Sequence, residues 1–254
     1  METSLNRSSG QLARRHGEYG FDEPVWPLLF GLLGVIFLVL GFLSFWMFDI
    51  PVLGVIWLVC AILFLFTAAS YVYTTRRGKF QVWAEILLQL GLRGDEQIID
   101  LGCGRGAVLL MAANLLPRGK ATGIDVWKAN EQSGNALSVT QQNAQREGVA
   151  GSVALHTADM QQLPFPDGSF DLVVSSLAIH NIRKSEGRKQ ALREAARVLK
   201  PGGRLVIADF FTRRYEECLR EFGMTDVTLH AFDWRFWYGG PWAVPRLVSA
   251  RKPS

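Results

Sequence analysis

The longest apolar pattern in the chain lies near its amino-terminal end. Between residues 25 and 75 the only charged residue is Asp49, and Pro51 follows it closely. The runs on either side, 25–48 and 50–73, each exceed the roughly 20 residues that a helix needs to cross a bilayer core of about 30 Å. A polar residue close to a proline favours a turn. The pattern therefore predicts a transmembrane helical hairpin, in preference to a hairpin buried in a large soluble core.

Basic residues flank this apolar segment on both outer sides, whereas the turn between its two runs has none. They are Arg14 and Arg15 before it, and Arg76, Arg77 and Lys79 after it. Because positive residues accumulate on the cytoplasmic side, we expect an integral protein of the cytoplasmic membrane, with both termini and everything after residue 76 in the cytoplasm. Residues 1–24 are polar and predict a flexible cytoplasmic tail.

Small residues on the first apolar run bear on assembly. Glycine occupies positions 31, 34 and 41, and glycines in a span let two helices approach closely. The lipid bilayer is therefore the first expected partner, and a homo-oligomer formed through the hairpin is a second hypothesis.

After residue 76 the periodicity changes. Apolar residues at 80, 83, 86, 87 and 90 predict an amphipathic juxtamembrane helix within 76–96, which lies against the membrane or caps the following domain. From residue 97 to 254, expected strands alternate with expected helices, which predicts an α/β domain with a parallel sheet and helices on both faces. The expected strands are Gln97–Leu101, Ala121–Asp125, Ser152–His156, Phe170–Ser175, Arg204–Asp209, Asp226–Phe232 and Ala243–Ala250. The expected helices are Ala107–Leu116, Lys128–Arg146, Ser185–Leu199 and Arg213–Phe222.

Charge and cysteine usage exclude some functions. The net charge of +4 comes without a dense stripe of lysine and arginine, so no nucleic-acid partner is expected. The three cysteines are scattered, at positions 60, 103 and 218. Their spacing predicts neither a disulfide framework nor a metal site.

The chemistry of the chain centres on the turn that follows the first expected strand. An apolar run ends in Asp100, and glycines follow at 102, 104 and 106. A strand that turns through glycines into a helix lets a ligand approach the backbone closely. Asp125 ends the second strand, where an acidic group can accept both hydroxyls of a ribose. Asp159 follows the third strand and can accept an exocyclic amine, while Met160 offers an apolar face to a base.

Five motifs, in order and at matching spacing, resemble the class I S-adenosylmethionine-dependent methyltransferases. They are Ile98–Gly106, Gly123-Ile124-Asp125, Ala158-Asp159 with Leu163-Pro164-Phe165, Phe170-Asp171-Leu172-Val173, and Leu199–Gly203. The resemblance covers roughly residues 85–250 and is closest to the branch with quinone, sterol and small-molecule methyltransferases. It implies a Rossmann-like seven-stranded methyltransferase sheet with S-adenosylmethionine as cofactor.

The resemblance also implies roles for individual residues. Asp100 and the turn of Gly102, Cys103, Gly104 and Gly106 would hold the methionine end of the cofactor, and Asp125 would bind its ribose. Val126 or Trp127 would pack on the adenine, and Asp159 and Met160 would recognise the adenine edge. Ser175 and Ser176 would face cofactor and substrate. The Leu199–Gly203 motif is interpreted as a helix-ending turn with a structural role.

Methyl transfer to a protonated nucleophile needs a general base. His180, which follows the fourth strand, is the first candidate because the unperturbed imidazole pKa suits proton abstraction. The alternative is a loop histidine that hydrogen-bonds to backbone. Asp209, at the end of the fifth strand, is a second candidate base.

Six aromatic residues crowd the segment 231–242, between the last two expected strands. They are Phe232, Trp234, Phe236, Trp237, Tyr238 and Trp242. They predict a wall of an apolar pocket or a membrane contact, and the alternative is packing on the sheet. Together with the hairpin they indicate a small lipophilic acceptor, such as a quinone precursor, phenol, thiol, lipid amine or fatty acid. A membrane-anchored sensor or scaffold that binds the cofactor without turnover is the alternative function.

Overall fold

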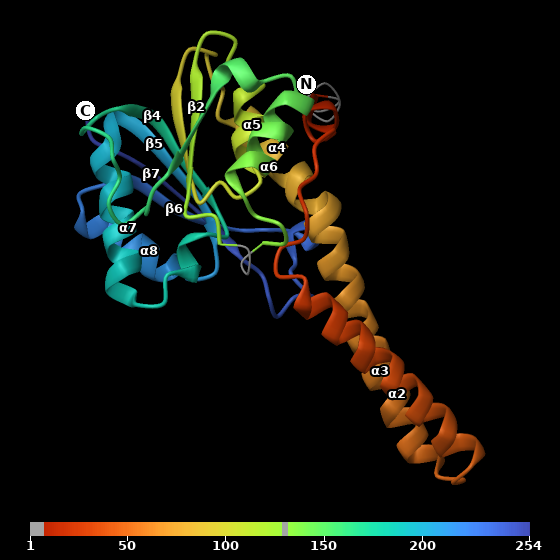
Figure 1. The fold of residues 1–254 in the computed structure, drawn as a ribbon. Coiled ribbons are helices and arrows are strands. Elements are labelled where there is room, and N and C mark those ends of the chain that lie inside the picture. Colours follow the sequence, from red (N-terminus) through yellow and green to blue (C-terminus); the bar gives the residue numbers. More distant parts are fainter. Residues whose placement is uncertain (1–7, 129–131) are drawn as a thin grey trace.

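The computed structural model describes residues 8–128 and 132–254 (Figure 1). The strands are β1 Gln97–Leu101, β2 Lys120–Asp125, β3 Val153–Thr157, β4 Phe170–Ser176, β5 Leu199–Asp209, β6 Thr225–Ala231 and β7 Arg246–Arg251. Within the described residues they form one seven-stranded sheet in the order β3-β2-β1-β4-β5-β7-β6. β1 to β5 are parallel, and β7 is antiparallel to both of its neighbours. The expectation of a Rossmann-like α/β domain is confirmed.

Helices cover both faces of this sheet (Figure 1). They are α4 Lys79–Gln89, α5 Ala107–Ala113 and α6 Leu137–Arg146 on one face, and α7 Ser185–Val198 and α8 Thr212–Glu221 on the other. Alternation along the strands supplies both cores, because successive strand side chains point to opposite faces. In β1, Ile98 joins the core under α4 and α5, while Ile99 and Leu101 join the core under α7.

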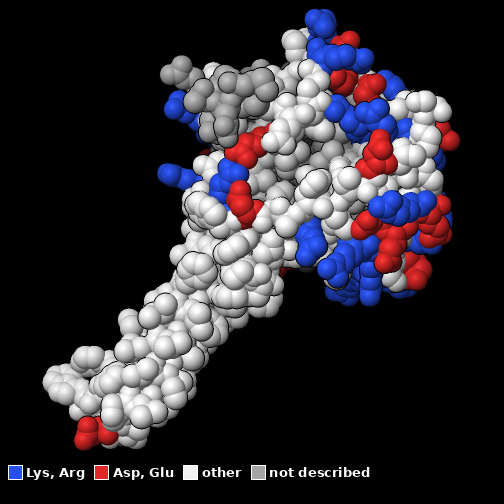
Figure 2. Space-filling view, turned by 180° about the vertical axis from the view of Figure 1, so that it is seen from behind, with Lys and Arg blue, Asp and Glu red and all other residues white. Residues whose placement is uncertain are grey.

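Two apolar helices, α2 Val25–Trp46 and α3 Pro51–Tyr73, form a hairpin that projects from the domain (Figure 1). Both are long and apolar enough to be candidate membrane spans, and only 17% of the most apolar window of each is buried in the protein. On the face that Figure 2 shows, the hairpin carries no Lys or Arg, and an acidic group is seen only at its tip, where Asp49 lies between α2 and α3. The helical hairpin expected from the apolar pattern is therefore present.

Glycines let the two helices of the hairpin approach closely. A Cβ on Gly34 would lie 2.7 Å from Cγ of Leu65, and one on Gly41 would lie 3.0 Å from Cδ2 of Leu58. Two of the three glycines considered for oligomerisation thus face α3 of the same chain, whereas a Cβ on Gly31 would meet open space. The small-residue argument for a homo-oligomer therefore rests on Gly31 alone.

The hairpin continues into the domain through the π-helical turn η1 Thr74–Gly78, which runs directly into α4. A Cβ on Gly78 would overlap the carbonyl oxygen of Arg235, so glycine is needed where the loop after β6 crosses the helix. α4 packs on the sheet, with Trp83 and Leu87 fully buried. Of the two placements expected for the juxtamembrane helix, the structure has the one that caps the sheet.

The amino-terminal segment departs from the expected flexible tail. Backbone N–H groups of His16 and Gly17 donate to Oε1 of Glu147 at 2.8 and 2.9 Å, and the hydroxyl of Tyr19 donates to the same atom at 2.9 Å. These bonds hold the pKa of Glu147 below its ordinary value although its burial opposes this. Asp22 pairs with Lys79 of α4. The segment therefore docks on the end of α6 and on the base of the hairpin.

Two element boundaries differ from the expected ones by more than three residues. The helix expected over 128–146 begins only at Leu137, because the backbone before it is extended at Ala136 and bridged between Gln132 and Asp22. Its expected residues 129–131 lie outside the described residues. The expected helix-ending turn over Leu199–Gly203 is the start of β5 instead, since Gly202 and Gly203 hydrogen-bond to the backbone of Lys252.

Candidate functional site

A cavity of about 990 Å³ opens at the carboxyl ends of β1, β2 and β4. The strand order reverses between β1 and β4, and ligands of open α/β sheets bind at such a switch point. Its volume lies at the upper end of the roughly 300–1,000 Å³ usual for small-molecule sites. Ten of the predicted cofactor and catalytic residues line it: Asp100, Gly102, Cys103, Gly104, Asp125, Val126, Asp159, Met160, Ser176 and His180.

The glycine turn forms the floor of the cavity. Gly102, Gly104 and Gly106 have φ angles of +72°, +51° and +88°, a region that side chains rarely adopt. A Cβ on Gly102 would also overlap Cβ of Ala178. The turn is tied to β2, because the N–H groups of Gly102 and Cys103 donate to the carbonyl of Ile124 at 2.9 and 3.0 Å. At its glycines this floor presents backbone to a ligand.

Asp100 contributes an unsatisfied charge-bearing group to the floor. Its side chain is 2% exposed, and Oδ1 has no hydrogen-bond partner in the part of the chain that the structure describes. Burial, and secondarily the nearby Asp125, raises the pKa of Asp100 to about 8. A buried orphan acceptor is costly unless a ligand satisfies it. The site therefore fits a ligand that brings a cation or a donor, as S-adenosylmethionine does.

Asp125 connects the ends of β1 and β2. Its Oδ2 accepts from the N–H of Gly104 at 2.8 Å, and its Oδ1 accepts from the N–H of Trp127 at 2.6 Å. The indole of Trp127 turns to Thr157, to which its Nε1 donates at 2.8 Å, and Trp127 is not among the described residues that line the cavity. Of the two candidates for adenine packing, the structure thus places Val126 in the cavity.

The remaining predicted cofactor residues also differ in whether they line the cavity. The hydroxyl of Ser175 is fully buried and donates to the carbonyl of Leu101 at 2.8 Å, so it ties β4 to β1 and does not face a ligand. Ser176 does line the cavity and accepts from Nε1 of Trp83 at 2.9 Å. Gly106 lies beneath the turn, as the left-handed residue before α5.

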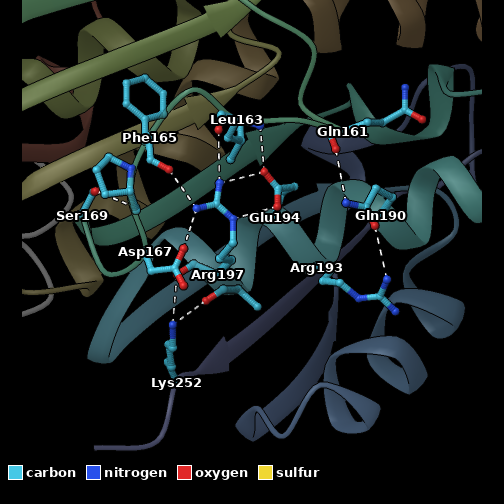
Figure 3. A network of polar contacts seen from close by, with 12 residues as sticks. Gln161, Leu163, Phe165, Asp167, Ser169, Gln190, Arg193, Glu194, Arg197 and Lys252 are labelled. Atoms are coloured by element: carbon cyan, nitrogen blue, oxygen red, sulfur yellow. Dashed lines mark hydrogen bonds and ion pairs between the residues drawn. The ribbon is translucent and has the colours of Figure 1, made fainter.

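Asp159 and Met160 lie on the loop between β3 and β4, and a partly buried ion pair between Arg197 and Glu194 shapes that loop (Figure 3). The guanidinium of Arg197 donates to the carbonyls of Leu163 and Phe165 and pairs with Glu194 at 2.8 Å. Oε2 of Glu194 in turn accepts from the N–H of Leu163 at 2.8 Å. α7 thus fixes the chain just after Met160, and the pairing lowers the pKa of Glu194 below its ordinary value.

His180 and Asp209, considered separately from the sequence, meet in the structure. Nδ1 of His180 lies 2.7 Å from Oδ1 of Asp209, and its backbone N–H donates to Oδ2 at 3.0 Å. Asp209 is fully buried and also accepts from the N–H of Phe210 and the hydroxyl of Tyr215. Asp209 is not among the described lining residues, whereas His180 is. The arrangement gives the cavity one imidazole, oriented by a carboxylate behind it.

The aromatic residues after β6 lie in three different environments. Phe236 is fully buried in the core, Tyr238 lines the cavity, and Trp234 and Trp242 are 57% and 62% exposed. Burial, with Asp22 nearby, raises the pKa of Tyr238 well above its ordinary value, so its hydroxyl stays protonated. The expected pocket wall and the alternative of core packing are thus both present, in different residues.

Sequence reasoning missed the contribution of the amino-terminal third. Asp22, Trp26, Phe30, Tyr71 and Lys79 all line the cavity. Asp22 lies 57 positions before its partner Lys79, so no local spacing links them. Lys79, expected only as one of the basic residues that flank the apolar segment, has a side chain that is 7% exposed. The one available signal was an acidic pair, Asp22 and Glu23, just before an uncharged run.

Comparison with known proteins agrees with this geometry. Residues 99–207 match the family model described as "Methyltransferase domain". The chain is similar to the ubiquinone/menaquinone biosynthesis C-methyltransferases UbiE of Pseudomonas fluorescens and Azotobacter vinelandii, each 32% identical over 135 and 134 residues. These alignments cover 52% of this chain, and the chain spans about half the length of the curated relatives it matches.

Solved structures share the fold at low identity. The [4+2]-cyclase SpnF has a TM-score of 0.54 at 23% identity, covering 68% of this chain and 83% of that one. A SAM-dependent methyltransferase from Aquifex aeolicus has a TM-score of 0.52 at 19% identity, covering 66% and 88%. Family match, fold and cavity agree: residues 99–207 match a methyltransferase domain, the surrounding sheet has the fold of S-adenosylmethionine-dependent methyltransferases of known structure, and the cavity fits S-adenosylmethionine as cofactor.

Proposed function

We propose that this chain is a membrane-anchored methyltransferase that acts on a small lipophilic acceptor at the cytoplasmic face of the membrane. The observation that carries the proposal is the lining of the cavity. The same cavity is lined by Asp100 of the cofactor turn, by His180, and by Trp26, Phe30 and Tyr71 at the base of the apolar hairpin. A site for a water-soluble acceptor needs no such wall.

The residues in the floor of the cavity would hold the cofactor. Asp100 would accept from its cationic end, Asp125 would accept from the ribose hydroxyls, and Val126 and Met160 would contact the adenine faces. Bound S-adenosylmethionine supplies a methyl group activated by its sulfonium. Because the methyl group is already activated, alignment in a dry site supplies much of the remaining catalysis.

His180 would accept the proton of the acceptor. Asp209 orients the imidazole through Nδ1, and His180 lines the cavity in which the acceptor hydroxyl would lie. A hydroquinone or phenol fits this arrangement, because removal of its hydroxyl proton raises the electron density of the ring. The likeness to the UbiE C-methyltransferases supports an acceptor of this class. Thiols, lipid amines and fatty acids are the other acceptors of the same proposal.

Charge supports the proposed topology. Exposed Arg76 and Arg77 follow the second span, Arg14 and Arg15 precede the first, and the tip carries only Asp49. Figure 2 shows Lys and Arg side chains on the domain beside the base of the arm and none on the arm. This distribution favours a cytoplasmic domain with both termini inside.

Formation of S-adenosylhomocysteine tests the proposal. The full chain in lipid nanodiscs is incubated with S-adenosylmethionine and lipid extract, or with panels of phenols, quinols, thiols and amines. We expect product with at least one lipophilic acceptor and its loss in His180→Ala. Cofactor binding without product across all panels would favour the alternative, a sensor or scaffold. The likeness of the fold to a cyclase shows that such a fold need not transfer a methyl group.

A further inference from the structure

The base of the hairpin is part of the cavity wall. Trp26 and Phe30 stand in the first turns of α2, their rings stacked with centroids 5.9 Å apart, and Tyr71 stands in the last turn of α3. All three line the same cavity as the cofactor turn. An anchor that only tethered the domain would not need to contribute side chains to its active site.

Rings connect this wall to the catalytic histidine without interruption. The centroids of His180 and Phe210 are 5.3 Å apart, those of Phe210 and Tyr238 are 6.5 Å apart, and those of Tyr238 and Tyr71 are 5.3 Å apart. All four residues line the cavity. Because these separations lie within the roughly 4.5–7 Å of aromatic contacts, the rings form a continuous apolar strip from the imidazole to the hairpin.

The polar groups near this strip are partnered with one another. Asp22 pairs with Nζ of Lys79 at 2.8 and 2.9 Å, and accepts from the hydroxyl of Tyr238 and from Nε2 of Gln132 at 3.0 Å. Glu23 accepts from Nε1 of Trp26 at 2.6 Å. The charges of Asp22 and Lys79 therefore neutralise each other, and the carboxylate of Glu23 is engaged by the indole of Trp26, which leaves the rings as the apolar surface beside these groups.

Contacts with the aromatic loop hold the end of α3 in place. The hydroxyls of Ser70 and Thr74 both donate to the carbonyl of Trp237, at 3.0 and 2.8 Å. Arg235 pairs in a bidentate manner with Glu85 of α4, at 2.6 and 2.8 Å. The loop that carries Tyr238 is thus fastened to the hairpin on one side and to the domain on the other.

We propose that the hairpin base, defined by Trp26, Phe30 and Tyr71, is the binding site for the apolar tail of the acceptor. The acceptor is then an amphiphile, with a phenolic head beside His180 and an alkyl or prenyl tail that follows the aromatic strip toward Trp26, Phe30 and the bilayer. This inference rests on the proposed function and deepens it, because it names the form of the substrate and the residues that select it.

A photoreactive acceptor analogue tests the placement of the tail directly. The probe is a para-alkylphenol with a diazirine in its alkyl chain, applied to the full chain in phosphatidylethanolamine and phosphatidylglycerol nanodiscs with S-adenosylhomocysteine present. We expect the label on the peptide that contains Trp26 and Phe30, and loss of that label when unlabelled long-chain phenol competes. A competed label on the sheet domain, away from α2 and α3, would overturn the inference.

Kinetics with two phenols provide the second measurement. We expect Phe30→Ala to lower the ratio of kcat/KM for a long-chain phenol to that for phenol itself by about tenfold, as loss of apolar contacts in a pocket does. The matched control is Phe42→Ala, a 59% exposed ring farther along the same helix, which leaves the ratio unchanged.

The outcomes separate the two proposals. Equal ratios in Phe30→Ala and Phe42→Ala, with product formed, would contradict the tail site and leave the methyltransferase proposal standing. Competed labelling of the hairpin base without product from any acceptor would support the tail site and contradict the methyltransferase proposal.

Discussion

At the scale of single residues, the site depends on two buried carboxylates with different surroundings. Asp209 accepts hydrogen bonds from His180, Phe210 and Tyr215, whereas Oδ1 of Asp100 has no partner among the described atoms. The first carboxylate is therefore arranged to orient a side chain. The second is arranged to receive a ligand.

Asp100 makes the ligand-free protein less stable as the pH rises. Its folded pKa of about 8 lies above the ordinary value, so between about pH 4 and 8 the folded state holds a proton that the unfolded state has released. The contribution of this group to the free energy of unfolding is therefore fully present below about pH 4 and is lost as the pH rises to about 8. We expect Asp100→Asn to raise the ligand-free Tm at pH 8, by about 2–4 °C for each kcal/mol gained.

The same substitution should weaken cofactor binding by about tenfold or more, because a charge-assisted hydrogen bond is removed. Calorimetric titration with S-adenosylmethionine measures this, and thermal denaturation between pH 5 and 8 measures the stability. Unchanged affinity in Asp100→Asn would show that this carboxyl does not contact the cofactor.

The His180 and Asp209 pair should behave as one catalytic unit. We expect His180→Ala to lower kcat by about 10²–10⁴-fold, the range for loss of a general base, while cofactor affinity stays close to that of the wild type. Asp209→Asn should lower kcat less, and the double variant should be no worse than His180→Ala alone. Additive losses in this cycle would contradict coupling through Nδ1, and full turnover in His180→Ala would remove its role as base.

At the scale of elements, strong periodicity was a good guide and weak periodicity was not. The hairpin and all five parallel strands stand within a few residues of their expected positions, except that β5 begins five residues early. The helix expected from residue 128 failed because the segment Gln132-Ser133-Gly134-Asn135 has no apolar face to bury. The docking of residues 16–22 could not be predicted, since partners such as Glu147 lie more than a hundred positions away.

Within the candidate site, too, some residues could be predicted from the sequence and others could not. Asp100, the glycines and Asp125 follow strand ends directly, so local order predicts them. Trp83 reaches Ser176 from a helix 93 positions earlier, and the wall formed by the hairpin arises only when the chain folds back on itself.

Arg197 is the element-scale test, because it joins α7 to the loop that carries Met160. Arg197→Met would leave Glu194, itself 8% exposed, without its cation and two carbonyls without a donor. We expect a loss of roughly 1–3 kcal/mol in the free energy of unfolding and weaker cofactor binding. The control is Arg193→Met on the same helix, whose side chain contacts Gln190 (Figure 3) and also lies over the ring of Phe222. Equal effects of the two variants on affinity would contradict a role of Arg197 in shaping the loop.

At the scale of the whole molecule, the proposed topology places the tip of the hairpin outside and the sheet inside. A membrane-impermeant maleimide should label Asp49→Cys in intact cells, and should label Arg213→Cys on α8 only after permeabilisation, in a background with Cys218→Ser. Labelling of Arg213→Cys in intact cells would invert the topology and place the site away from its cofactor supply.

Our central proposal is that the glycine turn at 102–106 and the base of the apolar hairpin line one active-site cavity. Transfer of isotopically labelled methyl from S-adenosylmethionine, measured by mass spectrometry in nanodiscs, tests this most directly. We expect a labelled product from a long-chain hydroquinone, lowered at least about 10²-fold by His180→Ala, and at least about tenfold less product from a water-soluble hydroquinone at equal concentration. Equal labelling of both acceptors, or labelling that stays undiminished in His180→Ala, would contradict this proposal.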